Sequence, residues 1–341
     1  MALDDLASAF ERFLAPIEAE MRAVVNAGTQ PALFNIMLNY HLGFADEHGH
    51  AVSARAGKRI RPVLTLLSCE ACGGDWRMAL PAAAAVELLH NFSLIHDDIE
   101  DRDELRRGRP TVWKLWGEAQ AINAGDAMFA LSHLALLRCA EAGARPAQVV
   151  QALRVFDEMC VQLTVGQHLD LSFETRNDVS TEEYLAMIGG KTAALIAAAC
   201  RIGALCADAT EAHADALEQF GRGLGVAFQL QDDVLGIWGD PVTTGKHSSD
   251  LVHRKKTLPV IFAAERDPAL RARYFDDLRP LSPEEVETIR ARIERLGGRQ
   301  YAESMAEQAY TQAVEALQRL PYTPAREALA ALARALLNRQ A

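Results

Sequence analysis

The sequence has few aromatic residues for a chain of its size. Phe, Trp and Tyr make up 6% of 341 residues, whereas 50% of the residues are hydrophobic, mostly Ala and Leu. These side chains favour close-packed helices over sheets, which are rich in β-branched and aromatic residues. The apolar content is sufficient for a large core. We therefore predict an all-α protein.

The chain also lacks an excess of positive charge. Its 46 Asp and Glu residues outnumber its 35 Lys and Arg residues, for a formal net charge of -11. Nucleic-acid-binding proteins usually carry a basic field, so we expect no nucleic acid partner. A small anionic ligand would need metal ions or local arginines. The start, Met1–Asp5, is acidic where a targeting peptide would be basic, so we expect a cytoplasmic protein.

Long hydrophobic runs and paired cysteine motifs are missing as well. The most apolar stretches, Ala82–Val86 and Ala193–Cys200, are too short to cross a bilayer, so no membrane span is predicted. The one C-x-x-C pair, Cys69 and Cys72, has no second pair at the spacing of a zinc ribbon. We expect all six cysteines to be reduced and mostly buried.

No repeat and no flexible linker divides the chain, so a single domain over residues 1–341 is expected. Proline is absent between Pro146 and Pro241, and apolar residues recur there at helical spacing, which predicts long central helices. Ser282 and Pro283 are typical of a helix start and predict C-terminal helices over 282–341. Breaks are predicted at 72–75, 106–110, 239–241 and 279–283.

An acidic cluster ends the apolar helical run Val86–Ile95. Asp97 and Asp101 are four residues apart and therefore about 40° apart around a helix axis, with Asp98 on the neighbouring face. Like charges at this spacing destabilise a helix unless a cation lies between them, and Mg²⁺ prefers carboxylate oxygens. A solvated acidic helix end would give the same string, so this cluster alone leaves both interpretations open.

A second acidic pair, Asp232 and Asp233, follows another apolar run, Leu224–Leu230. Two such clusters on separate helices can face each other across a cavity. A diphosphate ligand would also need guanidinium or ammonium groups for its terminal oxygens. The sequence offers such cations at Lys58, Arg61, Arg106, Arg107, Lys191 and Lys246, with Lys58 and Arg61 expected on one helix face.

Five motifs occur in the order typical of the trans-isoprenyl diphosphate synthases, or polyprenyl synthetases. The chain resembles that family over residues 30 to 265, in Gly57-Lys-Arg-Ile-Arg-Pro62, His90, Asp97-Asp-Ile-Glu-Asp101 with Arg106-Arg-Gly-Arg-Pro-Thr111, Gly190-Lys-Thr192, and Phe228-Gln-Leu-Gln-Asp-Asp233 with Lys246 and Lys255-Lys-Thr257. The resemblance implies antiparallel helices around a deep cavity, a homodimer, and condensation of isopentenyl diphosphate with an allylic diphosphate.

The resemblance also implies a role for each motif. Isopentenyl diphosphate would be bound by Lys58, Arg61, His90 and Arg107, and the allylic diphosphate by Arg106, Lys191, Lys246 and Lys255. About three Mg²⁺ ions would be held by carboxylates, a ligand type that Mg²⁺ favours: Asp97, Asp98, Asp101, Asp170, Asp232 and Asp233. Gln167 and Asp170 would form a supporting pair on a central helix, while Thr192 and Gln229 would face the developing allylic cation. Lys191, Thr192, Gln229 and Arg106 would thus be the catalytic residues.

One position departs from the family pattern. The second cluster usually ends in a third aspartate, and here that position is Gly236. The second cluster therefore offers the metal ions one carboxylate fewer, although Asp232 is retained. We expect the activity to survive, with weaker metal affinity.

Product length is predicted from the turn before Asp97. If the hydrocarbon tail runs along that helix, its floor lies about 6 to 7.5 Å away, at Ser93 and Phe92. The small side chain of Ser93 leaves room for the hydrocarbon tail, and the bulky ring of Phe92 stops the tail from growing further. In the family this pattern resembles geranylgeranyl (C20) synthases, with farnesyl (C15) synthases as the alternative.

Two other functions remain open. A class I terpene cyclase shares the helical fold and the first acidic cluster, but has no use for the second basic pocket around Lys58, Arg61 and His90. The chain also lacks the second metal motif of such cyclases. A non-enzymatic partner subunit would be expected to have lost the first cluster.

Overall fold

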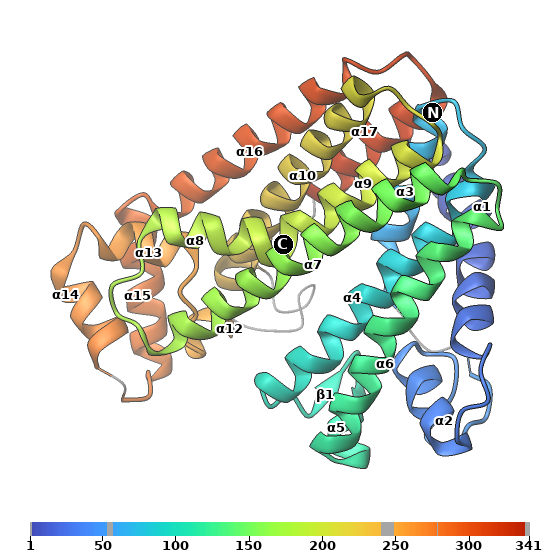
Figure 1. Cartoon of the computed structure of the whole chain (residues 1–341). Coiled ribbons are helices and arrows are strands. Elements are labelled where there is room, and N and C mark those ends of the chain that lie inside the picture. Colours follow the sequence, from blue (N-terminus) through green and yellow to red (C-terminus); the bar gives the residue numbers. More distant parts are fainter. Residues whose placement is uncertain (1, 53–56, 240–248, 278, 338–341) are drawn as a thin grey trace. The chain divides into compact units, whose positions relative to one another are not determined.

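The computed structural model describes residues 2–52, 57–239, 249–277 and 279–337. The described chain is helical apart from its loops and a two-residue β-hairpin (Figure 1). The prediction of an all-α protein is therefore confirmed. Of the predicted breaks, the one at 72–75 follows α3, and residues 106–110 form most of the hairpin. The predicted break at 239–241 lies outside the described residues after residue 239.

The chain divides into two compact units. The first unit comprises Met1–Phe156, Ala199–Asp215 and Leu320–Leu329. Its elements are α1 (Ala2–Val25), α2 (Ala32–His41), α3 (Ile60–Ala71), a 3-10 turn (Trp76–Ala79), α4 (Leu80–Glu100), β1 (Leu105–Arg106), β2 (Arg109–Pro110), α5 (Val112–Trp116), α6 (Glu118–Leu137) and a 3-10 turn (Arg138–Ala140). Within it α4 packs most extensively against α6.

The second unit comprises Asp157–Ala198, Ala216–Arg319 and Ala330–Ala341. Its own elements are α8 (Thr181–Ile188), a π-helical turn (Gly189–Ala193), α12 (Ser249–Val252), α13 (Leu258–Ala264), α14 (Pro268–Arg271), a second π-helical turn (Ala272–Asp276), α15 (Pro283–Arg295) and α16 (Gly298–Leu317). Four helices contribute residues to both units: α7 (Pro146–Thr175), α9 (Ala194–Cys206), α10 (Glu211–Trp238) and α17 (Pro324–Leu337). The expectation that the chain forms a single domain stays a prediction.

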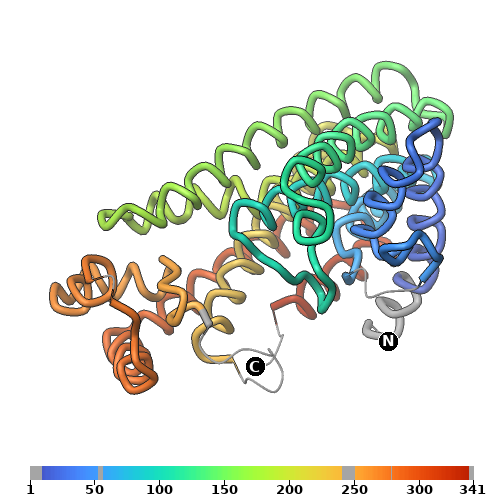
Figure 2. Tube along the Cα trace, turned by 90° about the horizontal axis from the view of Figure 1, so that it is seen from below, coloured from blue at the N-terminus to red at the C-terminus, as the bar shows by residue number. Residues whose placement is uncertain are grey.

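Apolar residues from much of the second unit form one buried core cluster, which includes Tyr184, Leu230, Val260, Ile289 and Ala306. These residues lie on α8, α10, α13, α15 and α16. The short helices between α12 and α15 form the orange group in Figure 2. The cluster therefore fixes the part of α10 that carries the second acidic pair.

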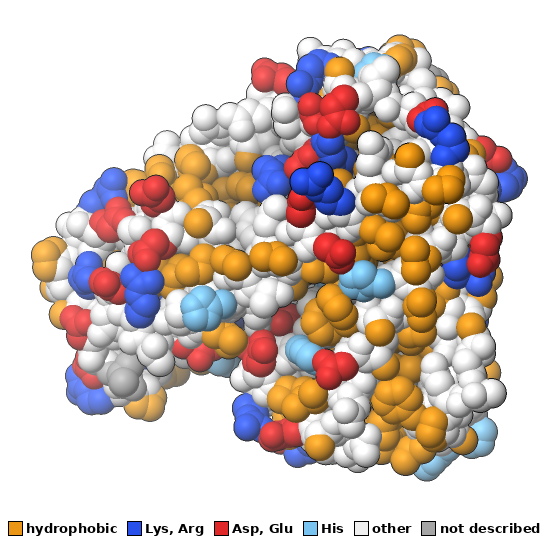
Figure 3. All heavy atoms as spheres, in the orientation of Figure 1, with side chains coloured by type: hydrophobic (Ala, Val, Ile, Leu, Met, Phe, Trp, Pro, Cys, Tyr) orange, Lys and Arg blue, Asp and Glu red, His pale blue; other side chains and the backbone are white. Residues whose placement is uncertain are grey.

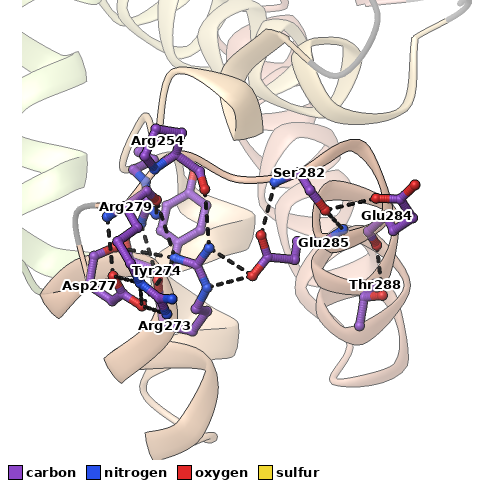
Figure 4. Close-up of polar contacts among 10 residues, drawn as sticks. Arg254, Arg273, Tyr274, Asp277, Arg279, Ser282, Glu284, Glu285 and Thr288 are labelled. Atoms are coloured by element: carbon purple, nitrogen blue, oxygen red, sulfur yellow. Dashed lines mark hydrogen bonds and ion pairs between the residues drawn. The ribbon is translucent and has the colours of Figure 1, made fainter.

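The start of α15 is fixed by a capping box. The Ser282 hydroxyl accepts a hydrogen bond from the Glu285 amide at 3.2 Å, and the Glu285 carboxylate accepts one from the Ser282 amide at 2.9 Å (Figure 4). This reciprocal pair satisfies two amides that a helix start leaves without partners. The predicted helix start at Ser282 is confirmed.

The segment between α12 and α13 is held from the neighbouring π-helical turn. Tyr274, which is 1% exposed, donates its hydroxyl to the backbone carbonyls of Asp250 at 3.2 Å and Lys255 at 3.1 Å. Arg254 donates in turn to the carbonyls of Tyr274 and Arg279 (Figure 4). These bonds fix the segment from Asp250 to Lys255.

Two helical stretches are longer and more apolar than the short runs discussed above. Trp76–Glu100 and Thr181–Cys206 have the length and composition that could cross a membrane. In each, 67% of the most apolar window is buried within the structure, as in the core helices of soluble proteins.

Candidate active site

The acidic cluster on α4 occupies its last turn. The amide of Asp101 donates to the carbonyl of Asp97 at 2.8 Å, so both residues belong to the same helical turn. Asp98 instead points inward and accepts a 2.6 Å hydrogen bond from Arg106 Nε. Burial raises the pKa of Asp98 to about 6, although the Arg106 guanidinium opposes the shift.

The donor set of this cluster fits a divalent cation. The second oxygen of Asp98, Oδ2, is buried and has no hydrogen-bond partner among the described residues. A buried carboxylate oxygen without a donor is costly unless a proton or a cation satisfies it. With Asp97 and Asp101 in the same turn, the helix end offers Mg²⁺ the oxygen ligands that it prefers.

Arg106 and Arg107 are presented by the hairpin that follows α4. Strands β1 and β2 pair in antiparallel register, and the two residues between them, Arg107 and Gly108, have φ values of 54° and 78°. Positive φ at both positions is typical of the tight turns that join two-residue hairpins. The turn places Arg107 against Gly57, where an added Cβ would lie 2.9 Å from Arg107 Nη2. Two of the sequence motifs therefore meet here.

Arg61 on α3 and His90 on α4 form the centre of a cluster of basic side chains. Arg61 Nη1 lies 3.2 Å from His90 Nε2, and because a guanidinium only donates, Nε2 accepts and the imidazole is neutral. Burial lowers the pKa of His90 well below its usual value, and the charges of Arg61 and Arg107 lower it further. Burial also lowers the pKa of Arg61. Positive charge gathered in this way favours an anion.

Lys58 is not on the helix that carries Arg61, contrary to our expectation. Helix α3 begins at Ile60, and Arg59 before it adopts a left-handed conformation with φ of 48°. The reason is an ion pair inside the protein: Arg59 Nη1 lies 2.6 Å from Glu87 Oε1 on α4, and both side chains are almost fully buried. The pair turns the chain so that Lys58 lies exposed ahead of α3.

His41, the last residue of α2, was not predicted as a site residue. Its Nε2 atom is buried and has no hydrogen-bond partner among the residues described. Burial lowers its pKa well below the usual value, and Arg106 and Arg107 add to the effect. No sequence motif marks this position, because its proximity to the arginines arises only from packing.

In the second unit, a chain of hydrogen bonds leads from the π-helical turn to α10. Thr192 Oγ1 donates to Gln229 Oε1 at 2.9 Å, and Gln229 Nε2 donates to Asp233 Oδ1 at 3.2 Å. Tyr184 on α8 donates its hydroxyl to the other oxygen of Asp233. Burial raises the pKa of Asp233 to about 7, and the bonds from Tyr184 and Gln229 oppose the rise. Asp232, the neighbouring residue, is exposed.

Lys191 pairs with Asp170 of α7 in the same unit. The approach of the two segments depends on Gly166, where an added Cβ would lie 2.8 Å from the Cα of Lys191. Any side chain at this position would separate α7 from the π-helical turn. Gln167, one residue later, lies on the same helix as Asp170, one turn before it.

Two predicted cations of the allylic site are less well defined. Lys255 is exposed, and its Nζ lies 3.8 Å from Asp250 Oδ1. Lys246 lies outside the described residues.

Of the two predicted chain-length residues, Phe92 lies on the face of α4 that packs against α6. The ring of Phe92 contacts that of Phe129 on α6, with centroids 5.1 Å apart, and that of His96 at 4.8 Å. Ser93 donates its hydroxyl to the carbonyl of His90 at 2.9 Å, so it presents no polar hydrogen to a ligand. Phe129 could not be chosen from the sequence, since no motif surrounds it.

These motifs coincide with a known family. The polyprenyl synthetase family model matches residues 45–296. The chain belongs to this family. The family prediction is thereby confirmed. The family uses Mg²⁺ to bind diphosphate substrates.

Relatives of this polyprenyl synthetase cover most of its length. It is 46% identical to a (2E,6E)-farnesyl diphosphate synthase of Mycobacterium tuberculosis over 314 residues, which are 89% of this chain and 86% of that protein. It is 41% identical to a geranylgeranyl diphosphate synthase of the same species over 286 residues, or 82% and 80% of the two chains. The crystal structure of a polyprenyl synthetase from Streptomyces coelicolor superposes with a TM-score of 0.90 at 40% identity, covering 97% of this chain and 99% of that one. The predicted enzyme class, a trans-prenyltransferase, is confirmed.

Proposed function

We propose that this protein condenses isopentenyl diphosphate with an allylic diphosphate and releases a trans-prenyl diphosphate, chiefly the C20 product. The observation that carries the proposal is the cluster of basic side chains in the first unit, with Arg61 and His90 at its centre and Arg107 beside Gly57. A cyclase ionises one diphosphate and needs no second anion pocket. An enzyme with two diphosphate substrates would use both this cluster and the carboxylates of α4.

In the proposed reaction the two kinds of site have different tasks. The pocket of Arg61, His90, Lys58 and Arg107 holds isopentenyl diphosphate by charge and by directed hydrogen bonds. Arg106, Lys191, Lys246 and Lys255 are the proposed partners of the allylic diphosphate. Asp97, Asp101 and Asp232 are the proposed principal ligands of about three Mg²⁺ ions, with Asp98, Asp170 and Asp233 behind them. Mg²⁺, when bound, neutralises the charge of the departing diphosphate.

Polar groups of the protein then stabilise the allylic cation that forms. The hydroxyl of Thr192 and the carbonyl of Gln229 are dipoles that the hydrogen bond between them holds in place. Fixed dipoles stabilise a developing positive charge without reorganising during the step. The double bond of isopentenyl diphosphate attacks the allylic carbon, and the loss of a proton completes the product. No side chain acts as a nucleophile.

Incorporation of labelled isopentenyl diphosphate tests the proposal. The purified protein is incubated with Mg²⁺ and, in separate reactions, dimethylallyl, geranyl or farnesyl diphosphate, and the dephosphorylated products are sized. We expect a predominant C20 alcohol. A C15 product would support the proposed synthase activity and correct the proposed product length, since the named relatives include both types of synthase. A cyclic hydrocarbon formed without any incorporated label would establish the cyclase instead.

We further propose that the protein works as a soluble homodimer. Three large hydrophobic side chains on α6, Ile122, Leu134 and Leu137, are 45%, 55% and 46% exposed. Hydrophobic side chains gather over this helix on the face shown in Figure 3. Contiguous apolar surface of this kind marks association sites. Light scattering of the purified protein should give twice the chain mass, and Leu134→Glu should shift it toward the monomer.

A further inference from the structure

The end of α2 is anchored on both sides of His41. Arg109 of the hairpin donates from Nη1 to the carbonyl of Tyr40 at 3.2 Å, and its guanidinium lies over the Tyr40 ring at 3.9 Å from the centroid. Arg59, ahead of α3, donates from Nη2 to the carbonyl of Leu42 at 3.0 Å. The carbonyls of both neighbours of His41 are therefore bound by arginines, one from the hairpin and one from the start of α3.

The two anchoring arginines come from the segments that carry the cluster of basic side chains. Arg109 is two residues after Arg107 in the hairpin, and Arg59 is two residues before Arg61. Arg107 in turn lies beside the segment ahead of α3, because an added Cβ at Gly57 would lie 2.9 Å from its Nη2. The end of α2 is therefore attached to both segments that form the cluster.

The imidazole of His41 is neutral in this setting. Burial lowers its pKa well below the usual value, and positive charges of the hairpin and of Arg59 lower it further. Burial and the charges of neighbouring arginines, which include Arg107 and Arg106, lower the pKa of His90 in the same way. A neutral imidazole has one N–H donor and one acceptor nitrogen. His41 therefore offers a donor to the cluster without adding to its charge.

The two imidazoles differ in the partner of Nε2. At His90 this atom accepts a hydrogen bond from Arg61 Nη1 at 3.2 Å. At His41 it is buried, and none of the described residues bonds to it, although guanidinium groups that could donate are nearby. A buried polar atom without a partner is costly unless a bound group satisfies it. The buried nitrogen of His41 therefore points to a ligand.

We propose that His41 is a further binding residue for isopentenyl diphosphate, and that its Nε2–H donates a hydrogen bond to a diphosphate oxygen. This inference rests on the proposed function. The arginines of the cluster supply positive charge, whereas the neutral imidazole adds a directed donor without further repulsion among the cations. The bond satisfies the buried nitrogen, and the anchors at Tyr40 and Leu42 hold the donor in place before the substrate arrives.

The test measures the binding of isopentenyl diphosphate by isothermal titration calorimetry in the presence of EDTA. Without divalent ions the carboxylates repel a diphosphate, so binding reports on the cluster of basic side chains. His41→Phe and His41→Asn both remove Nε2, whereas His41→Gln returns an amide N–H close to its position. We expect the dissociation constant to rise about 10-fold or more in the first two variants, and less than about threefold in His41→Gln. His48→Phe, at a side chain that is 71% exposed in the same unit, is the matched control and should leave the constant unchanged.

Circular dichroism identifies any variant that does not fold, and one folded variant without Nε2 is enough for the comparison. If neither folds, NMR of histidine-labelled wild-type protein decides, because the nitrogen signals of His41, assigned with His41→Gln, must shift when isopentenyl diphosphate is added.

An unchanged constant in folded His41→Phe or His41→Asn would overturn the proposal. An equal loss in His41→Gln would do the same, because the ring would then serve only the shape of the segment. A wild-type protein that incorporates label but binds nothing in EDTA would also contradict the inference. Absence of both binding and label incorporation by the wild-type protein would instead refute the proposed function, so the two failures are distinguishable.

Discussion

The carboxylate of Asp250 lies against Gly236, in the space that a side chain at this position would occupy. A Cβ at Gly236 would come within 2.6 Å of the Asp250 Cγ. Gly236 is the position where the family usually carries the third aspartate of its second cluster. A carboxylate is thus present beside this turn of α10, although it comes from α12.

Restoring the family residue should therefore harm this protein. We expect Gly236→Asp to lower the free energy of unfolding by roughly 1–3 kcal/mol, because the new side chain overfills the site and adds a like charge. Calorimetry of Gly236→Asp, Asp250→Ala and the double variant checks the cause. If the two changes are additive, the side chains do not compete for the same space.

The ion pair of Arg59 and Glu87 should contribute strongly to stability. Both side chains are buried, at 1% and 3% exposure, so removal of one leaves a charge without compensation. We expect Glu87→Ala to cost roughly 3–5 kcal/mol in urea unfolding. Glu70→Ala, which removes a more exposed partner of Arg12 in the same unit, is the control and should cost well under half as much. Equal losses of unfolding free energy in the two variants would show that burial does not increase the contribution of the Arg59–Glu87 pair.

Asp233 should make the metal-free protein less stable as pH rises. Its folded pKa is raised to about 7 from 3.8, so the protonated form is favoured by folding. The resulting stability is present below about pH 4 and is lost as the pH approaches 7, with a slope of at most about 1.4 kcal/mol per pH unit. Asp233→Asn should flatten this part of the pH profile in thermal melts. The exposed neighbour gives the control, because Asp232→Asn should keep the wild-type slope.

The basic pocket should control the affinity for one substrate. Arg61→Met removes the guanidinium beside His90, and we expect the KM for isopentenyl diphosphate to rise about 10- to 100-fold, the usual value of a hydrogen bond to a charged group. The KM for the allylic diphosphate should change less than threefold. His48→Gln, in an exposed loop of the same unit, should alter neither constant. Equal rises in both KM values would contradict the assigned role of Arg61.

The sequence was sufficient for the fold class and for the order of the motifs. Helices could be placed because their apolar periodicity and caps are local signals, as at Ser282. The orientation of individual side chains could not be inferred in this way. Asp98 and Asp233 are second members of similar acidic pairs, and both are directed inward by packing against Arg106 and Tyr184. Their assignment as metal ligands stays a prediction.

Other features depend on contacts between segments that are distant in the sequence. Lys58 leaves the helix face expected for it because Arg59 pairs with Glu87, 28 residues later. Phe129 and His41 join their clusters through helix packing, without any motif around them. A single sequence contains no signal for such pairs. The product-length layer was therefore predicted from one helix alone, at Phe92 and Ser93.

The pocket around Arg61 and His90 also has a consequence for handling the protein. In the role proposed for them, the Arg61 guanidinium and the His90 imidazole would recognise an oxyanion by charge and donor geometry, and neither would distinguish a prenyl chain from another substituent. Phosphate or sulfate in a buffer, and the inorganic diphosphate that accumulates during turnover, should therefore occupy it in competition with the substrate. Initial rates will depend on the choice of buffer anion, and progress curves should straighten when a pyrophosphatase is added.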